Sequence, residues 1–233
     1  MENKTLIETI NLVKHYPIGG KYFTALDHVD LAFERGEFAG LVGPSGSGKT
    51  TLLNIIGSLD NPSEGKVVVL GHSIGDLSHK EAAKLRNLHC GFIFQTYNLL
   101  PVYTVFENVE FPLLLIKTPA NDRRKAVLEA LAWVGLTDKM HSRPQQLSGG
   151  ESQRVAVARA MVKKPEIVLA DEPTANLDAK NSHNILQTME RLNRELETTF
   201  VFATHDEKVI QYLHRIISLE DGKVVKNEII KGS

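Results

Sequence analysis

The sequence predicts an α/β fold with a mixed, largely parallel sheet, an N-terminal antiparallel β-subdomain and an inserted α-helical subdomain. The run Ile167–Ala170 is continuously apolar, as is typical of a central parallel strand buried on both faces. Residues 5–42 are mostly strand-like, whereas residues from about 96 to 163 have helical patterns. A chain of 233 residues is long enough for one such domain, so residues 1–233 are expected to form a single unit.

The strands expected first in the chain have turns at Gly19-Gly20 and Arg35-Gly36, and Glu37–Val42 reads as a buried strand. Short strands are expected again at Val67–Leu70 and at Gly91–Phe94. The last strands are expected at Phe200–Thr204, Ile216–Leu219 and Val224-Val225. Asp221-Gly222 is a hairpin signal between the last two.

The helical region begins after Gln95. Helix starts are expected at Thr104–Glu107 and Asn121–Arg124, and Gly135 is a stop signal. A further helix is expected over Gly149–Lys163, ending before Pro165. A later apolar stripe at helical spacing is interpreted as core; it consists of Ile185, Leu186, Met189, Leu192 and Leu196.

The segment Gly43–Thr50 fits the phosphate-loop pattern Gly-x4-Gly-Lys-Thr. It lies between a strand and a helix, Thr51–Ile56, whose N-terminus would direct partial positive charge at a phosphate. A glycine-rich turn with a chance lysine is the alternative, but strand, loop, Lys-Thr and helix all occur in the required order. Lys49 is expected to bind the β- and γ-phosphates, and Thr50 to bind Mg²⁺. The residues expected to hold the nucleotide here are Gly43, Pro44, Ser45, Gly46, Ser47, Gly48, Lys49, Thr50 and Thr51.

Two carboxylates, Asp171 and Glu172, follow the strand Ile167–Ala170. Open α/β sheets bind ligands at this carboxyl edge. An acidic pair at a strand end is by itself often only solvated, but beside a phosphate loop it indicates catalysis. Asp171 is expected to hold Mg²⁺, and Glu172 to polarise the water that attacks the γ-phosphate.

With these motifs the chain resembles the nucleotide-binding subunit of ABC transporters over nearly its whole length. Gly43–Thr50 match the Walker A motif, Ile167–Glu172 match Walker B with the catalytic glutamate, and Leu147–Gln153 match the signature motif. Shorter matches are Gln95 to the Q-loop glutamine, Ala175–Asp178 to the D-loop, His205 to the switch histidine, and Tyr16 to the aromatic residue that stacks on adenine. The resemblance implies ATP and Mg²⁺ as cofactors, with Gln95 also near the metal.

The resemblance also implies that two copies pack head to tail. Ser148, Gly149 and Gly150 of one copy would then complete the ATP site of the other, and Asp178 would link the two sites. The catalytic residues expected are Glu172, His205 and Lys49.

One residue departs from the family pattern. Many members have Gln at the position of Glu151, where a carboxylate would repel phosphate. However, Ser148–Glu151 also fits the capping box, so Glu151 is expected to cap its own helix.

Within the family, the chain is similar to the lipoprotein-releasing and macrolide-exporting branch, which has cell-division and peptide-resistance relatives. The stretches that carry this similarity are Thr24–Asp27, Leu53–Asp60, Gly91–Pro101, Glu107–Val109 and Ala170–Asp178. This similarity favours export or extraction of a membrane-associated substrate, powered through a separate membrane permease. A regulatory ATPase of the cell-division type is the alternative. A soluble ATPase of chromosome or translation work is disfavoured, because the chain has neither a long coiled-coil insertion nor a second ATPase domain.

The composition limits partners and location. A net charge of −1 gives no basic field for nucleic acid, and the single cysteine, Cys90, fits a reducing compartment and a buried position. No apolar run reaches the roughly 18 residues that span a bilayer, and Met1–Leu6 lacks the apolar core of a signal peptide. We therefore expect a cytoplasmic protein, peripheral on the cytoplasmic face of a membrane.

The apolar segment Thr96–Tyr103 has two interpretations: it docks a cytoplasmic helix of the permease, within about residues 95–106, or it only seats the helical insertion. Several basic residues and histidines outside the motifs are not expected to form a functional site. Arg123, Arg124 and Lys125 are expected on a solvated face. Six further histidines lack metal-ligand spacing and are expected to be ordinary surface or core residues; they are His72, His79, His89, His141, His183 and His214.

Overall fold

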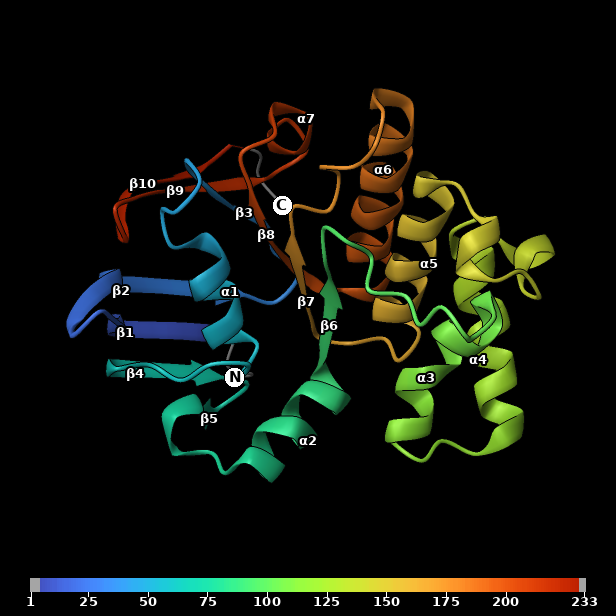
Figure 1. Cartoon of the computed structure of the whole chain (residues 1–233), viewed down its shortest axis with the longest axis horizontal. Coiled ribbons are helices and arrows are strands. Elements are labelled where there is room, and N and C mark those ends of the chain that lie inside the picture. The colour runs from blue at the N-terminus through green and yellow to red at the C-terminus, as the bar shows by residue number, and fades with distance from the viewer. Residues whose placement is uncertain (1–4, 231–233) are drawn as a thin grey trace.

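Two β-sheets and the helices around them form residues 5–230, the part of the chain that the computed structural model describes (Figure 1). The strands are β1 (Thr5–Ile18), β2 (Lys21–Glu34), β3 (Phe38–Val42), β4 (Glu64–Val69), β5 (His72–Ser73), β6 (Cys90–Ile93), β7 (Ile167–Asp171), β8 (Thr199–Thr204), β9 (Arg215–Glu220) and β10 (Lys223–Ile229). The α-helices are α1 (Lys49–Ile56), α2 (His79–His89), α3 (Val105–Leu115), α4 (Ala120–Trp133), α5 (Gly149–Met161), α6 (Ala179–Leu196) and α7 (Glu207–Ile210).

The larger sheet has six strands in the order β10-β9-β3-β8-β7-β6. Its neighbours pair in parallel from β9 through β3, β8 and β7 to β6, and only the edge strand β10 is antiparallel. The predicted mixed, largely parallel sheet is therefore confirmed. Because β8 separates β3 from β7, the loops that follow these three strands all lie at one edge of the sheet.

The smaller sheet is antiparallel, in the order β2-β1-β4-β5, as predicted for the N-terminal strands. The predicted turn at Gly19-Gly20 joins β1 to β2, and both glycines have positive φ, where a side chain would be strained. Figure 1 shows α1 between the two sheets. The buried apolar face of α1, with Leu52 and Ile56, joins one cluster with residues of both sheets.

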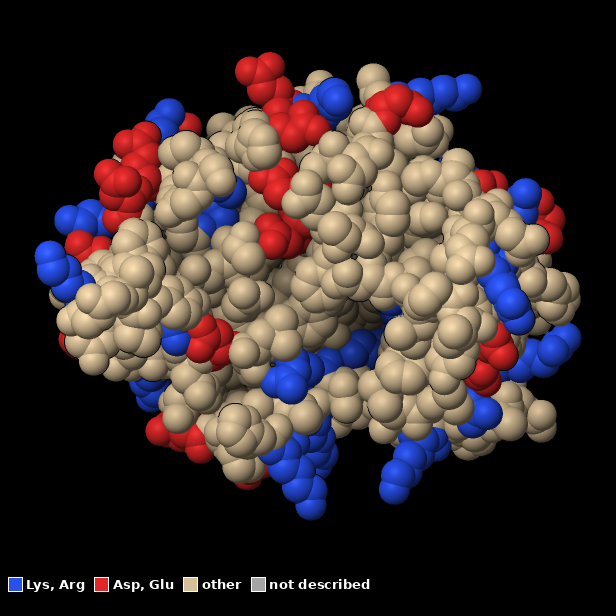
Figure 2. Space-filling model, viewed as in Figure 1, with Lys and Arg blue, Asp and Glu red and all other residues tan. Residues whose placement is uncertain are grey.

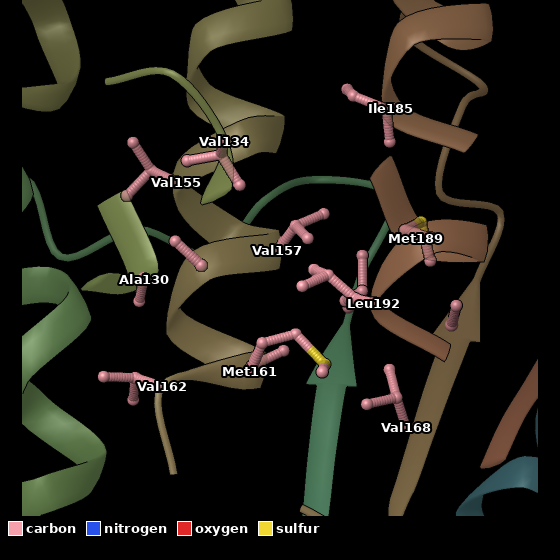
Figure 3. Close-up of a cluster of buried hydrophobic side chains, with 14 of the residues drawn as sticks. Ala130, Val134, Val155, Val157, Met161, Val162, Val168, Ile185, Met189 and Leu192 are labelled. Carbon is pink, nitrogen blue, oxygen red and sulfur yellow. The ribbon is translucent and has the colours of Figure 1, made fainter. Parts of the chain in front are cut away.

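A second apolar cluster lies on the opposite face of the larger sheet, under α3–α6. Figure 3 shows side chains of α4, α5, α6 and β7 meeting there, including Ala130, Met161, Val168 and Met189. Successive residues of β7 face opposite clusters: Val168 belongs to this one, and Leu169 belongs to the cluster around α1. Burial on both faces explains why this strand is apolar throughout.

The predicted boundaries agree with the structure to within a few residues. The predicted capping box at Ser148–Glu151 is present, and the predicted helix start at Thr104–Glu107 forms a second one. Thr104 and Glu107 cap α3 reciprocally, and Ser148 and Glu151 do so for α5. The helix α2 is one that the sequence interpretation missed. A third capping box, Ser78 with Glu81, begins this helix and was the available signal.

Arg123 is the one residue of the predicted solvated basic face that behaves differently. Its guanidinium donates to Glu110 at 2.8 Å and to the Thr118 carbonyl at 2.8 Å, and so ties α4 to α3. Arg124 and Lys125 are exposed, as predicted. Cys90 is buried, also as predicted, and burial raises the pKa of its thiol to about 11.

No helix within residues 5–230 is long and apolar enough to cross a bilayer. The expectation about a signal peptide concerns Met1–Leu6, of which residues 1–4 lie outside the described part of the chain. In the same described part, no group of three or more His, Cys, Asp or Glu side chains is placed so that it could hold a metal ion.

Candidate functional site

A cavity of about 500 Å³ opens between the two sheets, beside the N-terminus of α1. Most residues predicted from separate motifs meet in it. It is lined by Tyr16, Phe23, Ala25, Ser45, Gly46, Gly48, Lys49, Thr50, Thr51, Gln95, Asp171, Glu172 and His205. Phe23 and Ala25 were not predicted. Phe23 lies directly opposite Tyr16 in the β1–β2 pair, so the register of this hairpin places a second aromatic ring in the cavity.

The loop before α1 has the backbone shape that a phosphate cradle needs. Gly48 takes the left-handed conformation, with φ of +101°, and a Cβ there would lie 2.5 Å from the Ala25 carbonyl oxygen. A Cβ on Gly43 would lie 2.1 Å from the Leu219 carbonyl oxygen, so neither glycine can be replaced without movement. Within the described residues, no side chain caps α1 and its first turn carries no acid. The partial positive charge of this helix end is therefore available to an anion.

Lys49 is folded onto its own loop. Its ammonium donates to the carbonyl oxygens of Gly43 and Pro44, both at 2.8 Å. Burial lowers the pKa of Lys49, against the attraction of Glu172 and Asp171. Backbone carbonyls are weak partners for a cation, so a triphosphate entering the cavity would offer this ammonium a stronger one.

Thr50 and Asp171 form the set of oxygen atoms that suits Mg²⁺. The Thr50 hydroxyl lies 3.2 Å and 3.1 Å from the two carboxylate oxygens of Asp171, although the two residues are far apart in the sequence. Burial raises the pKa of Asp171, and the hydrogen bond from Thr50 opposes that rise. One hydroxyl and one carboxylate would fill only part of the octahedral shell of Mg²⁺. The remaining positions would be left for phosphate oxygens and waters. Gln95 also lines this cavity.

Glu172 has an unusual backbone conformation, with φ of +45°. Its N–H donates to the carbonyl oxygen of Ala203 on the neighbouring strand at 2.9 Å. Its carboxylate accepts from the Thr204 hydroxyl at 3.1 Å and lies 2.6 Å from Nδ1 of His205. A left-handed non-glycine residue at a strand end persists only where its surroundings hold it, and here the end of β8 does so.

His205 and Glu172 thus form a pair at the mouth of the cavity, with Thr204 as a further partner. The His205 side chain is 68% exposed, whereas that of Glu172 is only 15% exposed. The imidazole is therefore open to solvent, whereas the carboxylate is largely enclosed. Thr204 was not predicted, and its position, directly before His205 at the end of a buried strand, was the available signal.

The signature residues lie elsewhere. In the described part of the chain, Ser148, Gly149 and Gly150 do not line the cavity. Ser148 caps α5, and the Glu151 carboxylate accepts from the Ser148 N–H at 2.8 Å. Glu151 therefore caps its helix, as the capping-box pattern predicts. Asp178, another predicted site residue outside the cavity, caps α6 by accepting from the Asn181 N–H at 2.8 Å.

Comparison with known families agrees with these motifs. The family model described as "ABC transporter" matches residues 26–175. The chain belongs to this family. The match covers the phosphate loop, the signature segment and the acidic pair, and so confirms the family resemblance of the sequence.

Relatives of known sequence extend the match beyond that range. An uncharacterized ABC transporter ATP-binding protein of Methanocaldococcus jannaschii, MJ0796, is 44% identical over 231 residues, which are 97% of this chain and 98% of that protein. The macrolide export ATP-binding/permease protein MacB of Burkholderia pseudomallei is 42% identical over 224 residues. These are 96% of this chain but only 34% of MacB, so the chain spans about a third of that relative. The predicted similarity to the macrolide-exporting branch is supported.

Solved structures confirm the predicted ABC ATPase fold. A dimeric structure of MJ0796 in a post-hydrolysis state, bound to ADP and Pi, has a TM-score of 0.90 and 43% identity, and covers 97% of this chain and 100% of the other. CbiO1 from Clostridium perfringens, part of an ABC transporter complex, has a TM-score of 0.87 and 29% identity over 97% of this chain and 89% of that one.

Proposed function

We propose that the chain binds ATP with Mg²⁺ in the cavity beside α1 and hydrolyses it to ADP and phosphate. The observation that carries this proposal is the convergence of the uncapped N-terminus of α1 with the pairs Thr50–Asp171 and Glu172–His205. These groups come from three separate chain segments and meet around one cavity. The relative of similar structure that was solved with ADP and Pi supports the same chemistry.

Each residue is assigned a role by its position. Lys49 and the N–H groups of the phosphate loop hold the β- and γ-phosphates, and Tyr16 packs against the base. Thr50 and Asp171, with Gln95 near them, would hold Mg²⁺, which neutralises phosphate charge when bound. The Glu172 carboxylate orients a water for attack on the γ-phosphorus, and the exposed His205 contacts the γ-phosphate. The leaving group is ADP, and the attacking water contributes its oxygen to inorganic phosphate.

We further propose that the working site is shared between two copies packed head to tail. The signature residues Ser148, Gly149 and Gly150 lie outside the cavity of their own chain, and they would face the ATP of a second copy. The dimeric structures of a relative with 43% identity support this arrangement. ATP would then stabilise the dimer, and hydrolysis would loosen it.

The Glu172→Gln variant tests both proposals together. This change keeps the size of the side chain but removes the charge that polarises water. We expect hydrolysis to fall by a factor of roughly 10² to 10⁴, the scale of losing a general base. ATP binding should remain, so the variant should run as a dimer in size-exclusion chromatography with ATP and as a monomer without it. A variant that stays monomeric at saturating ATP would contradict the shared site.

A hollow of about 330 Å³ next to residues 95–106 supports a membrane permease as the partner. Its walls are mainly apolar, and it is lined by Leu59, Arg86, Asn87, Cys90, Gly91, Phe92, Phe94, Asn98, Phe111, Pro112, Leu115, Arg159, Ala160 and Lys163. Figure 2 shows Lys and Arg side chains gathered in a hollow below the centre of the view. Of the predicted docking segment, Val102 is 72% exposed, whereas Leu99 packs against the core. The exposure of Val102 supports the docking interpretation, and the packing of Leu99 supports the seating interpretation.

A permease docked here would hold the chain at the cytoplasmic face of a membrane. Export or extraction of a membrane-associated substrate is the favoured role, because a macrolide export protein is among the relatives that match nearly all of this chain.

Charge-introducing variants test the docking site. Val102→Glu changes an exposed side chain, and Leu100→Glu changes a half-buried one in the same segment. We expect both to lose permease-stimulated activity in membranes, with Val102→Glu keeping wild-type soluble ATPase and thermal stability. Val225→Glu, on a 54% exposed residue of β10, is the matched control and should leave coupling intact. Equal loss of coupling in the control would contradict a specific docking segment.

A further inference from the structure

The aromatic ring expected beneath the base is held by groups that lie outside the cavity. The hydroxyl of Tyr16 donates to Oδ2 of Asp60 at 2.7 Å. The other carboxylate oxygen, Oδ1, accepts from the Lys14 ammonium at 2.6 Å and from the Asn61 N–H at 2.7 Å. Asp60 does not line the cavity, whereas Tyr16 does, so the carboxylate would act on a ligand there through the ring and not directly.

Asp60 is tied to the helix that the phosphate loop precedes. It follows α1, and the backbone N–H groups of Leu59 and Asp60 both donate to the carbonyl oxygen of Asn54 on that helix, at 2.8 Å and 3.3 Å. Tyr16 belongs to β1 of the other sheet. The hydrogen bond between them therefore joins the strand that presents the ring to the helix whose N-terminus would hold the phosphates.

Lys14 completes this arrangement from the same strand. Only 9% of Lys14 is exposed, and its ammonium also donates to the Asn61 carbonyl oxygen at 2.8 Å. The ammonium lies 4.9 Å from the centre of the Tyr16 ring, within range of a cation–π contact. Lys14 and Tyr16 are two positions apart in β1, and Phe23 lies opposite Tyr16 in β2. The ring is thus held at its hydroxyl by Asp60 and beside its face by Lys14, and Phe23 lies opposite it in the strand pair.

We propose that Asp60 is a positioning residue that fixes the Tyr16 ring as the platform for the base of the nucleotide. This inference rests on the proposed nucleotide binding. A tyrosine ring without an anchor rotates about its side-chain bonds, and holding it on binding costs conformational entropy. In an anchored ring this conformational entropy is already lost on folding, before the ligand binds. The same anchor sets the distance between the base platform and the phosphate helix.

The titration behaviour of the pair supports a persistent contact. Burial opposes the charge on Asp60, but the Lys14 ammonium and the Tyr16 hydroxyl outweigh it and hold the pKa of the carboxyl below its usual range. Burial, followed by the bond to Asp60, raises the pKa of Tyr16. Near neutral pH the acceptor therefore stays ionised and the phenol keeps the proton that it donates.

The test compares a ligand that has a base with one that does not. The variants are Asp60→Asn, Tyr16→Phe and the double variant, with Asp76→Asn and Tyr22→Phe as matched controls at exposed positions. For each we would measure KM and kcat for ATP and the inhibition constant of Mg²⁺-tripolyphosphate, which has phosphates but no base. We expect Asp60→Asn to raise KM for ATP roughly fivefold to tenfold, the scale of one ordinary hydrogen bond, with kcat within about twofold of wild type.

The inhibition constant for tripolyphosphate should stay unchanged in every variant. The double variant should be no worse than the single variants, because both changes break the same contact. If tripolyphosphate binding weakens in step with ATP, Asp60 supports the phosphate loop or the fold, and the proposal is overturned. An unchanged KM in Asp60→Asn overturns it as well. A wild-type chain that neither hydrolyses ATP nor binds tripolyphosphate contradicts the proposed function instead.

Discussion

Two helix N-termini of this protein are built from similar glycine-rich segments but differ in what covers them. The first helix, α1, follows Gly48 in the left-handed conformation and has neither a side-chain cap nor an acid in its first turn. The N-terminus of the signature helix, α5, is capped by a reciprocal pair of hydrogen bonds. The Ser148 hydroxyl accepts from the Glu151 N–H, and the Glu151 carboxylate accepts from the Ser148 N–H. One helix end is open to an anion, whereas the other is already satisfied within its own chain.

This difference separates the proposed roles of the two segments. At α1 the partial charge of the helix and the Lys49 ammonium both favour phosphate. At α5 the Glu151 carboxylate offsets the helix charge, so the signature residues cannot act as a second phosphate loop of equal strength. They would contribute a close-fitting surface of Ser148 and two glycines against a nucleotide that another copy holds. We therefore expect substitutions at the N-terminus of α1 to abolish nucleotide binding, and substitutions at the N-terminus of α5 to abolish dimer assembly.

The largest effect should come from Lys49→Ala. This change removes the fixed cation that the loop would bring to the triphosphate. We expect ATP hydrolysis to fall by a factor of at least about 10², the scale of removing one preorganised charge contact, and most ATP affinity to be lost. Circular dichroism should show an intact fold, because the ammonium donates to groups of its own loop: the carbonyl oxygens of Gly43 and Pro44 and the Ser47 hydroxyl. The control Lys66→Ala removes the same charge from an exposed strand position. Near-normal turnover by Lys49→Ala would refute the role of this loop.

A pair of glycine variants sharpens the contrast further. Gly48→Ala should distort the phosphate loop, because alanine is strained at φ of +101° and its Cβ would lie 2.5 Å from a carbonyl oxygen. A Cβ at Gly149 would lie 3.0 Å from the Tyr97 hydroxyl and at ordinary contact distance, 3.7 Å, from the Asn176 carbonyl oxygen, and the φ of Gly149 lies outside the range that favours glycine. We expect Gly149→Ala to keep the melting temperature and monomeric ATP binding but to lose ATP-dependent dimerisation. Normal dimerisation by this variant would place the partner's nucleotide away from Gly149.

The smallest effect concerns the cap itself. Glu151→Ala should lower the free energy of unfolding by about 1 kcal/mol, as for loss of a helix cap, whereas Gln also fits the capping box and should lose less. The hydrogen bond from the Ser148 N–H lowers the pKa of Glu151. Its charged form therefore adds stability above the unfolded pKa of about 4.3, and that stability is lost as pH falls through the lower folded pKa. Thermal melts of wild type and Glu151→Gln should converge on acidification. A difference independent of pH would show that the charge of the cap contributes nothing.

Local patterns made much of the fold predictable. Each capping box pairs residues three positions apart, so the starts of α3 and α5 can be read from the sequence alone. The strand β7 was equally clear, because burial on both faces leaves no polar position in its interior. The start of α2 carried the same box, Ser78 with Glu81, but this helix has only one buried residue, Leu85, and hence no apolar stripe to draw attention to it.

Contacts across the chain were not predictable in the same way. Thr204 and Phe23 escaped notice because their partners, Glu172 and Tyr16, lie on neighbouring strands, and strand register has no signal within one segment. The exposure of Val102 beside the packed Leu99 was also hidden, since both are apolar and lie in one loop. Sequence alone left both interpretations of that loop open.

The sequence by itself determined the phosphate loop, the acidic pair, the signature segment and their order, because each depends on residue types at fixed short spacing. Only the tertiary structure decided that Thr50 meets Asp171, that Glu172 is held in a left-handed conformation beside His205, and that Asp60 anchors Tyr16. The physical reason is the sheet order: with β8 between β3 and β7, and with α1 lying against both sheets, loops that are distant in the chain end at one cavity.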